Sequence, residues 1–510
     1  MKKLSFLTRT TLLLGSFFAL DKLLAFARAA IILRQFQLSA TLDSFYFADL
    51  LPSWEVAVFS GSALAMAMIP VLSQTLTLKG RQAMWDSFSR IANLAFVVTG
   101  IAAILAAVFA EPIIRFWIAP GLSPEQQQFT ARLMRVDLIA TFIFSISGLV
   151  IAALQTNQHF LLPAIAPILY NVGQIFGAVI LAPSHPYSFG PLVVPVFGLG
   201  VYGLVYGIIL GAAMHLAIQI PGLIRYKFTW TPSLDIRQPD LIEMFKVLWP
   251  RLLTALGVQL MFTARANLAS RLGQAGAFSA ISNGWMIMQV PETLLGTAIA
   301  TAMLPTLSEF AARADWDSFR QTIEKGLRVL IALTLPAGAI IAAGIHPLLR
   351  LIINQAGTDL LTATARVYML TLCGYAVQEI AARALYARKE ALIPLATVAF
   401  RLVVYLAIGI SGLILFKSFG APVIAFAEIS LTAEAIAMFI ILNRRMDKPV
   451  RIDGVIFKGL AAALVGGVVT YALAVVLPGG AVITAILGMF AGTIIALVIV
   501  RKELRLLLNL

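Results

Sequence analysis

The sequence has few charges and very little cysteine or histidine for its length. Only 12% of its 510 residues are Asp, Glu, Lys or Arg, whereas soluble domains usually carry about 25%. The single cysteine, Cys373, excludes an internal disulfide and a cysteine-based metal site. The four histidines are too scattered for a metal-ligand motif: His159, His185, His215 and His346. We therefore expect no metal site and no cofactor.

Sequence motifs of enzymes are also missing. The chain contains no GxSxG, P-loop or HExxH sequence. Its longest expected cytoplasmic connection, around 222–240, is too short for a catalytic domain. The formal net charge of +14 does not indicate nucleic-acid binding, because the basic residues stand in short connections between apolar runs. The sequence thus predicts neither an enzyme nor a nucleic-acid-binding protein.

Long apolar runs dominate the chain, and 60% of its residues are hydrophobic. Residues 91–110 and 481–500 contain no charge, and about 20 apolar residues suffice to cross a bilayer as a helix. Dividing the remainder at proline, glycine and charged stretches gives fourteen candidate helices: 8–35, 42–75, 85–110, 127–156, 160–182, 195–221, 240–270, 276–309, 317–344, 358–387, 390–416, 420–443, 455–478 and 480–501. The predicted fold class is all-α, an integral membrane protein with about 14 transmembrane helices.

The distribution of Lys and Arg predicts how these helices are oriented. Nineteen basic residues fall in the connections on the side of the N-terminus and at most five on the other side. Basic loops face the cytoplasm, so we expect both termini to be cytoplasmic and the number of spans to be even. Residues 1–27 have features of a signal peptide, but Asp21 and Lys22 interrupt its apolar stretch. We expect this segment to be the first transmembrane helix.

The chain contains an internal duplication. Residues 63–74 (ALAMAMIPVLSQ) and 298–309 (AIATAMLPTLSE) are identical at seven of twelve positions, and each is followed by the tetrapeptide WDSF. Further downstream the two copies stay in register at a separation of 231 residues, which aligns Arg135 with Arg366 and Pro163 with Pro394. Upstream, residues 27–34 match 264–271, which aligns Arg28 with Arg265. A colinear series of this kind predicts two repeats of one structure.

The repeat length predicts how the copies are related. Six helices per copy is an even number, so both copies enter the membrane from the same side and are related by an axis along the membrane normal. We expect two pseudo-symmetric six-helix lobes, at 1–222 and 223–449, followed by two extra C-terminal helices at 450–510. Parallel repeats of this kind occur in alternating-access transporters, which bind substrate near the midplane of the bilayer.

Charged residues within the predicted helices are candidates for function. A charge at a helix centre costs about 3 kcal/mol on insertion scales, so such residues usually pair with one another or line a water-filled cavity. One interpretation is an ion pair of Asp21 with Lys22 or Arg28. The other is that Arg28 and Arg265, together with Lys22, form a cationic site between the lobes, because the arginine fork suits phosphate oxygens.

Other charged residues have simpler explanations. Glu379 and Arg383 are four residues apart and are expected to pair along one helix, and Asp137 is expected to pair with Arg132 or Arg135. A last group could be either a structural network or a site for a coupling ion, and it consists of Asp21, Arg401, Glu428 and Glu434.

Several segments resemble the MurJ/MviN lipid II flippases of the MOP exporter superfamily. They include LLAFARAAIILRQF, TLDSFYFADLLP and AMAMIPVLSQ between Asp21 and Pro70, and the segments 118–125, 154–172 and 290–309. The resemblance covers nearly the whole chain. It implies a V-shaped, two-lobed transporter in the cytoplasmic membrane that moves undecaprenyl-pyrophosphate-linked peptidoglycan precursor to the outer leaflet. It also implies a cationic central cavity for the headgroup and a groove at the last two helices for the lipid tail.

The resemblance carries over to individual residues only in part. Arg28 matches the family's first-helix arginine, Lys22 stands where an arginine is usual, and Asp43 matches the acidic residue that opens the second helix. Two family arginines are replaced by Val56 and Met286, and Gly61 replaces a glutamate. We therefore expect the substrate site to consist of Lys22, Arg28, Asp43 and Arg265, with Arg265 compensating for the missing arginines.

The sequence leaves three other functions open. A flippase for another polyprenyl-diphosphate glycan, of the O-antigen or exopolysaccharide type, would also use a cationic cavity. A MATE-like cation exporter is disfavoured because the first helix is net basic. From a different class, a non-transporting scaffold or lipid receptor would bind membrane lipids and cell-wall synthesis proteins. The coupling ion and the energy source do not follow from the sequence.

Overall fold

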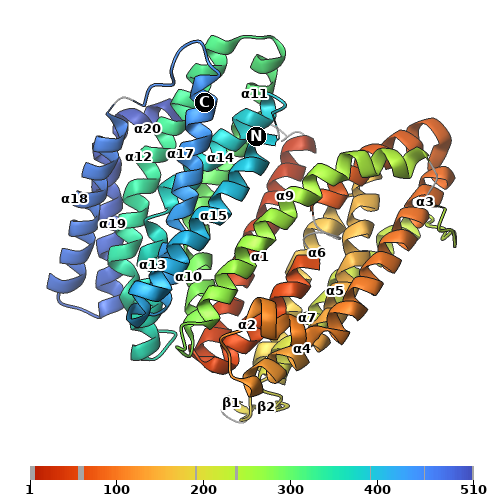
Figure 1. Cartoon of the computed structure of the whole chain (residues 1–510), viewed down its shortest axis with the longest axis horizontal. Helices are drawn as coiled ribbons and strands as arrows, with labels where there is room; N and C mark the ends of the chain where they lie inside the picture. Colours follow the sequence, from red (N-terminus) through yellow and green to blue (C-terminus); the bar gives the residue numbers. More distant parts are fainter. Residues whose placement is uncertain are drawn as a thin grey trace. The chain divides into compact units, whose positions relative to one another are not determined.

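The computed structural model describes residues 6–55, 62–189, 192–235, 239–390, 392–452 and 454–507 (Figure 1). The chain forms two compact units, Met1–Asn267 and Leu268–Leu510. The expected lobe boundaries, at 222/223 and 449/450, stay a prediction.

The first unit is a bundle built around the helix α5. Its elements are α1 (Phe6–Phe36), α2 (Ala40–Glu55), α3 (Ser62–Val108), α4 (Ala110–Ile113), the π-helix η2 (Ile114–Ile118), α5 (Pro124–Thr156), α6 (Leu161–Phe176), the π-helix η3 (Gly177–Leu181), the strands β1 (Tyr187–Phe189) and β2 (Leu192–Val194), α7 (Val201–Ala217), α8 (Ile220–Arg225) and α9 (Pro239–Ser270). Helix α5 packs against α2, α3 and α7, and α6 packs against α1 and α7. Trp85 and Phe88 of α3 lie in an apolar core that α5 completes with Leu149 and Leu154.

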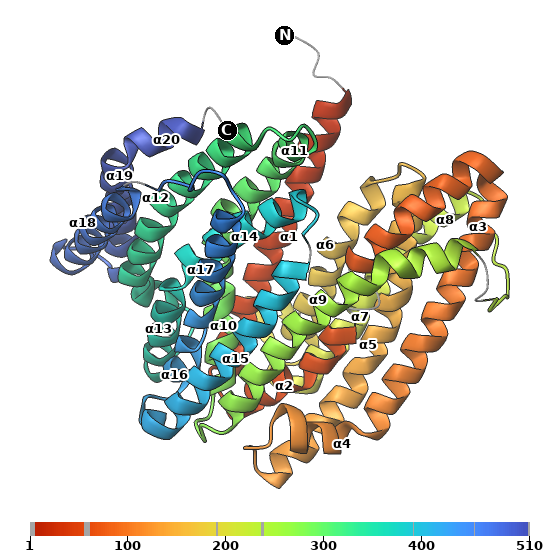
Figure 2. The ribbon, with the colours of Figure 1, turned by 45° about the horizontal axis from the view of Figure 1, so that its top comes forward.

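The second unit is a bundle built around the helix α12. Its elements are α10 (Ala277–Pro291), the π-helix η4 (Glu292–Thr297), α11 (Ala298–Ala312), α12 (Trp316–Leu349), α13 (Gln355–Met369), α14 (Leu372–Ala387), α15 (Leu392–Leu415), the 3-10 helix η5 (Lys417–Phe419), α16 (Ala421–Phe426), α17 (Ile429–Arg444), α18 (Val455–Val476), α19 (Ala481–Ile499) and α20 (Arg501–Leu507). The last long helices, α18 and α19, pack side by side and both contact α12 (Figures 1 and 2).

The all-α membrane fold is confirmed. Among the described residues, ten helices are long and apolar enough to cross a membrane, or eleven if the bent pair α13 and α14 forms one span. The predicted number of fourteen is not confirmed. The helices α1 and α2 were predicted to span as well, and they carry the charges at Asp21, Lys22, Arg28 and Asp43 that lower their hydropathy.

Two local features concern the connections between helices. A break was expected between 75 and 85, and two helical segments of α3 meet there at a kink, where Gly80 has a non-helical φ of 86° and ψ of 179°. Lys79 and Arg81 are exposed beside the kink, so the apolar run ends where the helix is broken. The strands β1 and β2, which were not expected, pair antiparallel and align Tyr187 with Val194. These strands have three residues each, which is too short for an alternating pattern to be recognised.

The internal duplication is visible in local structure at the separation of 231 residues. Ser123 accepts a hydrogen bond from a backbone N–H of the first turn of α5, and Asn354 does the same for α13. The turns after α5 and after α14 contain Gln158 at φ 59° and Lys389 at φ 62°. The aromatic pair Trp85–Phe88 has a centroid separation of 5.6 Å and the pair Trp316–Phe319 one of 5.7 Å, both edge-on. The predicted repeat is therefore a repeat of structure, because caps, turns and ring contacts all recur in register.

Candidate functional site: buried polar clusters

Polar side chains of α1, α2, α5 and α6 form a cluster inside the first unit. This first-unit cluster consists of Asp21, Arg28, Asp49, Asp137, Tyr170 and Asn171. Asn171 Nδ2 of α6 donates a hydrogen bond to Asp21 Oδ1 of α1 at 2.8 Å. The guanidinium of Arg28, seven residues further along α1, acts electrostatically on Asp49 and on Tyr170. The spacing of seven places Asp21 and Arg28 on one face of α1, and that helix packs against α6.

Two carboxyl groups of this cluster meet directly. Asp49 of α2 and Asp137 of α5 lie within hydrogen-bonding reach of each other. Asp49 Oδ2 also accepts a hydrogen bond from Ser53 at 3.0 Å, while the Asp137 side chain is buried, with 1% of the residue exposed. The expected pairing of Asp137 with Arg132 or Arg135 is wrong. Arg135 instead donates to the Ala107 carbonyl at 2.9 Å, because its side chain reaches along α5 toward the end of α3.

The residues predicted to form the cationic site have different surroundings. Lys22 is 62% exposed and its Nζ lies 3.8 Å from Asp21 Oδ2, which realises one of the two pairings considered for Asp21. Arg28 is half-buried and Asp43 is buried at the start of α2. Arg265 is 3% exposed, and its guanidinium lies 5.0 Å from the ring centroid of Phe262. A cavity shared by these residues stays a prediction.

Two of the three departures from the family pattern cannot be placed. Val56 and Gly61 lie outside the described residues. Met286 is half-buried on α10.

The second unit contains a larger buried cluster on α14, α15, η4 and the helices α16 and α17. Its first part is centred on Arg401, which forms ion pairs with Glu428 and, at 3.5 Å, with Glu434. Both glutamates are fully buried, and Thr397 donates a hydrogen bond to Glu434 at 3.3 Å. The structure thus brings together three of the four residues of the predicted network. Asp21, the fourth, belongs to the first-unit cluster. Whether this group has a structural or an ion-coupling role stays a prediction.

The second part of this cluster contains residues that sequence reasoning missed. The predicted ion pair of Glu379 and Arg383 is confirmed, and Arg383 also donates to Thr301 at 3.0 Å. Buried Glu292 of η4 lies nearby and accepts hydrogen bonds from Thr297 at 2.7 Å and Thr293 at 3.2 Å. Tyr375 is within electrostatic reach of both parts. A glutamate in the middle of the apolar run 276–309 was the available signal for Glu292.

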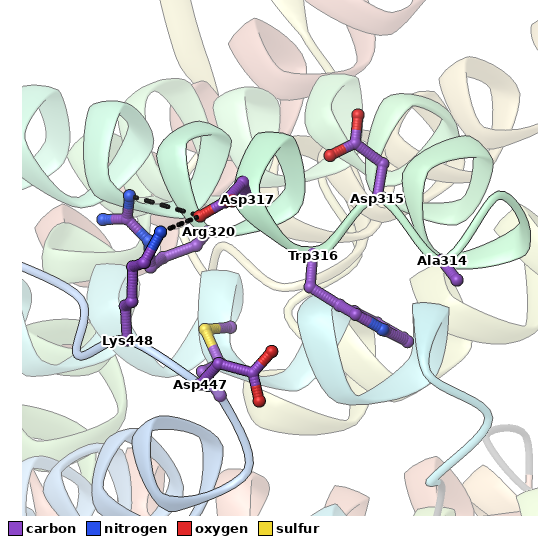
Figure 3. Close-up of a pocket in the computed structure, with 8 residues that line it drawn as sticks. Ala314, Asp315, Trp316, Asp317, Arg320, Asp447 and Lys448 are labelled. Carbon is purple, nitrogen blue, oxygen red and sulfur yellow. Dashed lines mark hydrogen bonds and ion pairs between the residues drawn. The ribbon is translucent and has the colours of Figure 1, made fainter.

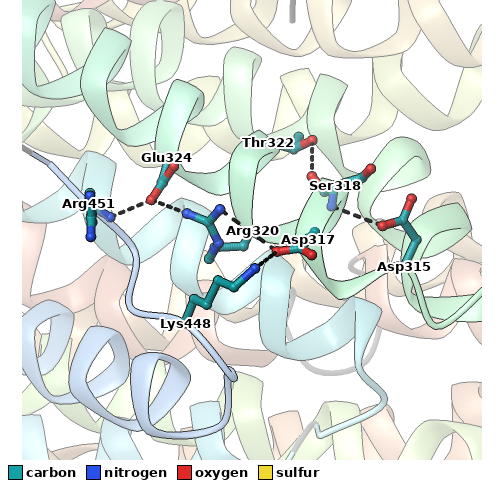
Figure 4. A network of polar contacts seen from close by, with 8 residues as sticks. All are labelled: Asp315, Asp317, Ser318, Arg320, Thr322, Glu324, Lys448 and Arg451. Carbon is teal, nitrogen blue, oxygen red and sulfur yellow. Dashed lines mark hydrogen bonds and ion pairs between the residues drawn. The ribbon is translucent and has the colours of Figure 1, made fainter.

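A pocket of about 280 Å³ opens where α12 begins, beside the linker from α17 to α18 (Figure 3). Its charged lining residues are three aspartates and two cations: Asp315, Asp317, Asp447, Arg320 and Lys448. Figure 4 shows Asp317 between the two cations, at 3.3 Å from Lys448 and 3.9 Å from Arg320. Arg320 also pairs with Glu324 at 2.6 Å, which in turn accepts the Arg451 backbone N–H. These contacts hold the linker against α12. The pocket is lined by more carboxylates than cations, which disfavours an anionic ligand.

Metal binding has no support in the described ranges. They contain no group of three or more His, Cys, Asp or Glu side chains placed to hold a metal ion. The two buried clusters combine arginine and carboxyl groups with hydroxyl and amide groups, which suits proton or ion binding and the recognition of polar groups rather than bond chemistry.

Two repeats of apolar helices with ionisable groups buried inside them define the chain as a multi-pass membrane protein. The family profile described as "Lipid II flippase MurJ" matches residues 33–499, so the chain belongs to the lipid II flippase MurJ family. This is a family of transporters, and the chain is not an enzyme.

Individual relatives agree with this assignment. The lipid II flippase MurJ of Burkholderia cenocepacia is 29% identical over 398 residues, which cover 75% of this chain and 74% of the relative. The probable lipid II flippase MurJ of Haemophilus influenzae is 25% identical over 467 residues, 87% of this chain and 84% of that one.

Solved structures share the fold at lower identity. A structure titled "Lipid II flippase MurJ, inward closed conformation" is 17% identical and superposes with a TM-score of 0.75, covering 97% of this chain and 100% of that one. An inward-facing multidrug resistance MATE family transporter is 14% identical with a TM-score of 0.68, covering 85% of this chain and 95% of the other. At these identities the likeness shows the fold alone.

Proposed function

We propose that the chain is a flippase that moves lipid II, the undecaprenyl-pyrophosphate-linked peptidoglycan precursor, from the inner to the outer leaflet of the cytoplasmic membrane. The observation that carries this proposal is the family match across residues 33–499. The curated relatives that share this match are named as lipid II flippases, and they align with about three quarters of the chain or more in the two cases compared above.

The chemistry of the substrate explains why such a protein needs charges inside apolar helices. Removing a pyrophosphate from water is unfavourable unless cationic groups and hydrogen-bond donors replace the lost hydration. Lys22 has an exposed ammonium group on α1, and its closest acidic neighbour is 3.8 Å away. An exposed ammonium within an apolar helix is costly against lipid, so this position favours contact with water or an anionic ligand. Lys22, Arg28, Asp43 and Arg265 are the proposed substrate-binding residues.

The transport cycle follows from the repeat architecture. Each repeat contributes helices to one side of a parallel-repeat transporter, and alternating access exposes the bound headgroup first to the cytoplasm and then to the outer leaflet. The lipid tail stays in the bilayer, and we assign its groove to α18 and α19, whose exposed side chains include Phe457, Leu464 and Phe490. Both termini lie in the cytoplasm, as the basic connections predict.

A depleted strain provides the test. Expression of this chain in bacteria depleted of their own lipid II flippase should restore growth and the accessibility of lipid II at the outer leaflet. Lys22→Glu should lower both readouts at equal expression, because the substitution reverses the charge that faces the headgroup. Lys417 is an exposed cation on η5, so Lys417→Glu is the matched control and should behave as the parent chain.

Two results would separate the alternatives. Growth without restored accessibility of lipid II would contradict flipping and favour a scaffold or lipid receptor for cell-wall synthesis proteins. Restored transport of an O-antigen or exopolysaccharide carrier lipid, with no effect on lipid II, would favour a flippase for another polyprenyl-diphosphate glycan. We expect neither, since the family match is to the lipid II flippases.

A further inference from the structure

The contact between Asp49 and Asp137 differs from every other charged contact described in the two clusters. In the second unit, Arg401 lies between Glu428 and Glu434 and pairs with both. In the first unit, the two aspartates contact each other without an intervening arginine. Two adjacent carboxylates repel strongly in a medium of low dielectric constant, so such pairs commonly hold one proton between them.

The hydrogen bonds of the pair also indicate a shared proton. Asp137 is 1% exposed, and its Oδ1 is buried without a hydrogen-bond donor. The hydroxyl of Ser53 donates to Asp49 Oδ2 at 3.0 Å and so serves the other carboxyl group. Ionised carboxylates only accept hydrogen bonds, and a buried acceptor without a donor is costly. One proton on the pair supplies an O–H donor between the two groups.

The charges around the pair also favour one bound proton. Arg28 of α1 is the cation that acts on Asp49, and Tyr170 of α6 is the neutral titratable neighbour. Asp137 is buried and interacts electrostatically with Asp49. Asp21 forms an ion pair with Lys22 and accepts a hydrogen bond from Asn171. One cation therefore faces two carboxyl groups, and one bound proton makes the group neutral.

Several ionisable groups on helices packed against α2 and α5 have contacts of their own. His215 of α7 bonds to Ser147 at 2.7 Å, and Asp86 of α3 accepts from Thr231 at 2.6 Å. Arg115 of η2 lies 5.3 Å from the Phe116 ring, and Arg81 of α3 lies 5.5 Å from the Tyr226 ring. Arg28 and Tyr170 are the groups of the first-unit cluster that interact electrostatically with the pair.

The internal repeat shows that the fold itself does not require the pair. The position equivalent to Asp137, 231 residues later, is Tyr368 on α13, which is buried against Trp285. A neutral aromatic side chain thus fills the same place in the second repeat. Acidic side chains inside a membrane protein are costly, so packing alone does not account for the two aspartates of the first repeat.

We propose that Asp49 and Asp137 together form a proton-binding site in the first unit, and that proton loading of this site is linked to the transport cycle. The second half of this statement rests on the proposed flippase function. A change of net charge by one in a membrane-embedded group makes a conformational equilibrium sensitive to pH and to the membrane potential.

Infrared difference spectroscopy of the full chain in nanodiscs tests the binding half directly. A pH step should change the carbonyl stretching band of a protonated carboxylic acid, and this change should be lost in Asp49→Asn and in Asp137→Asn. The amide group that Asp137→Asn introduces is neutral and can donate a hydrogen bond to Asp49, so this variant should fold. Asp86→Asn is the matched control and should keep the band, because its carboxylate already has a hydroxyl donor.

Transport tests the second half. Asp137→Asn should flatten the pH profile of lipid II accessibility, whereas Asp86→Asn should preserve it. An unchanged infrared band in both pair variants overturns the proton site, as does a parent band that responds to Na⁺ at constant pH, which would indicate a metal ion instead. An unchanged pH profile in Asp137→Asn overturns the link to transport. If the parent chain moves no lipid II but the band is lost in the variants, the flippase proposal fails and the proton site stands.

Discussion

Arg135 and Arg366 are equivalent in the two repeats and make the same contact. The Nε of Arg135 donates to the Ala107 carbonyl at 2.9 Å, and the Nε of Arg366 donates to the Ala342 carbonyl at 2.8 Å. Arg135 lies in α5 and Arg366 in the last turn of α13, and each bond reaches the last turns of the preceding long helix, α3 or α12. Because both arginines are exposed, we expect Arg135→Ala and Arg366→Ala each to lower the free energy of unfolding by about 1 kcal/mol. The double variant should lose the sum, since the two sites share no contact.

Equilibrium unfolding in detergent measures these losses. Arg132→Ala is the matched control, because Arg132 is exposed on the same helix three residues earlier. Its effect should stay within about 0.5 kcal/mol. A loss from Arg132→Ala as large as that from Arg135→Ala would mean that charge on α5, rather than the bond to Ala107, sets the stability.

Arg401 should be among the most sensitive positions of the second unit. Replacing it by alanine removes the cation that pairs with the buried Glu428 and Glu434, and breaking a buried ion pair in this way costs about 3–5 kcal/mol. The triple variant Arg401→Met, Glu428→Gln and Glu434→Gln should recover most of that loss, because it removes all three charges together. Thermal unfolding of both variants provides the comparison. Equal losses in the single and triple variants would contradict an electrostatic origin.

The start of α12 should make stability depend on pH in the acid range. Hydrogen bonds from Ser318, including its backbone N–H at 3.0 Å, lower the pKa of the exposed Asp315 carboxyl group from its ordinary value of 3.8. A lowered pKa in the folded state means that the stabilisation is present above the unfolded pKa and is lost as pH falls through the folded pKa. Asp315→Asn keeps the cap and should remove this part of the pH dependence. The melting temperatures of the two proteins should therefore differ most above the ordinary pKa of 3.8 and should converge as pH falls through the lowered pKa of Asp315.

The helices could be predicted from the sequence because each is an apolar run that ends at a glycine, proline or charged residue. The predicted range 455–478 corresponds to α18 (Val455–Val476), and 240–270 corresponds to α9 (Pro239–Ser270). The repeat was equally accessible, since it depends on identities such as WDSF. The break between 75 and 85 was predicted as well, and Gly80 kinks the chain there. The short strands β1 and β2 were not predicted, because three residues each are too few for an alternating pattern.

The polar clusters could be predicted only as far as single helices allow. The pair of Glu379 and Arg383 follows from a spacing of four on one helix. Asp49 and Asp137 are 88 residues apart and meet only because α2 packs against α5. The sequence shows that each aspartate is a charged residue in an apolar segment, but it does not show which residue of another helix lies opposite. The predicted pairing of Asp137 with an arginine of α5 was wrong, because spacing along one helix does not show which neighbouring helix packs against it.

Glycines set the distance between α6 and α7. Gly173 of α6 and Gly177, which begins η3, face Gly211 and Gly207 of α7, and the spacing of four lets the two backbones approach closely. A Cβ on Gly177 would lie 2.5 Å from the Gly207 Cα, and backbone atoms cannot turn aside as a side chain can. We expect Gly177→Ala to cost about 3 kcal/mol, at the upper end of overpacking effects. Gly480→Ala is the control, because a Cβ there would meet no heavy atom within 4 Å. Similar melting temperatures for the two variants would mean that the helices separate at little cost, and the contact between α6 and α7 would then not hold the first unit together.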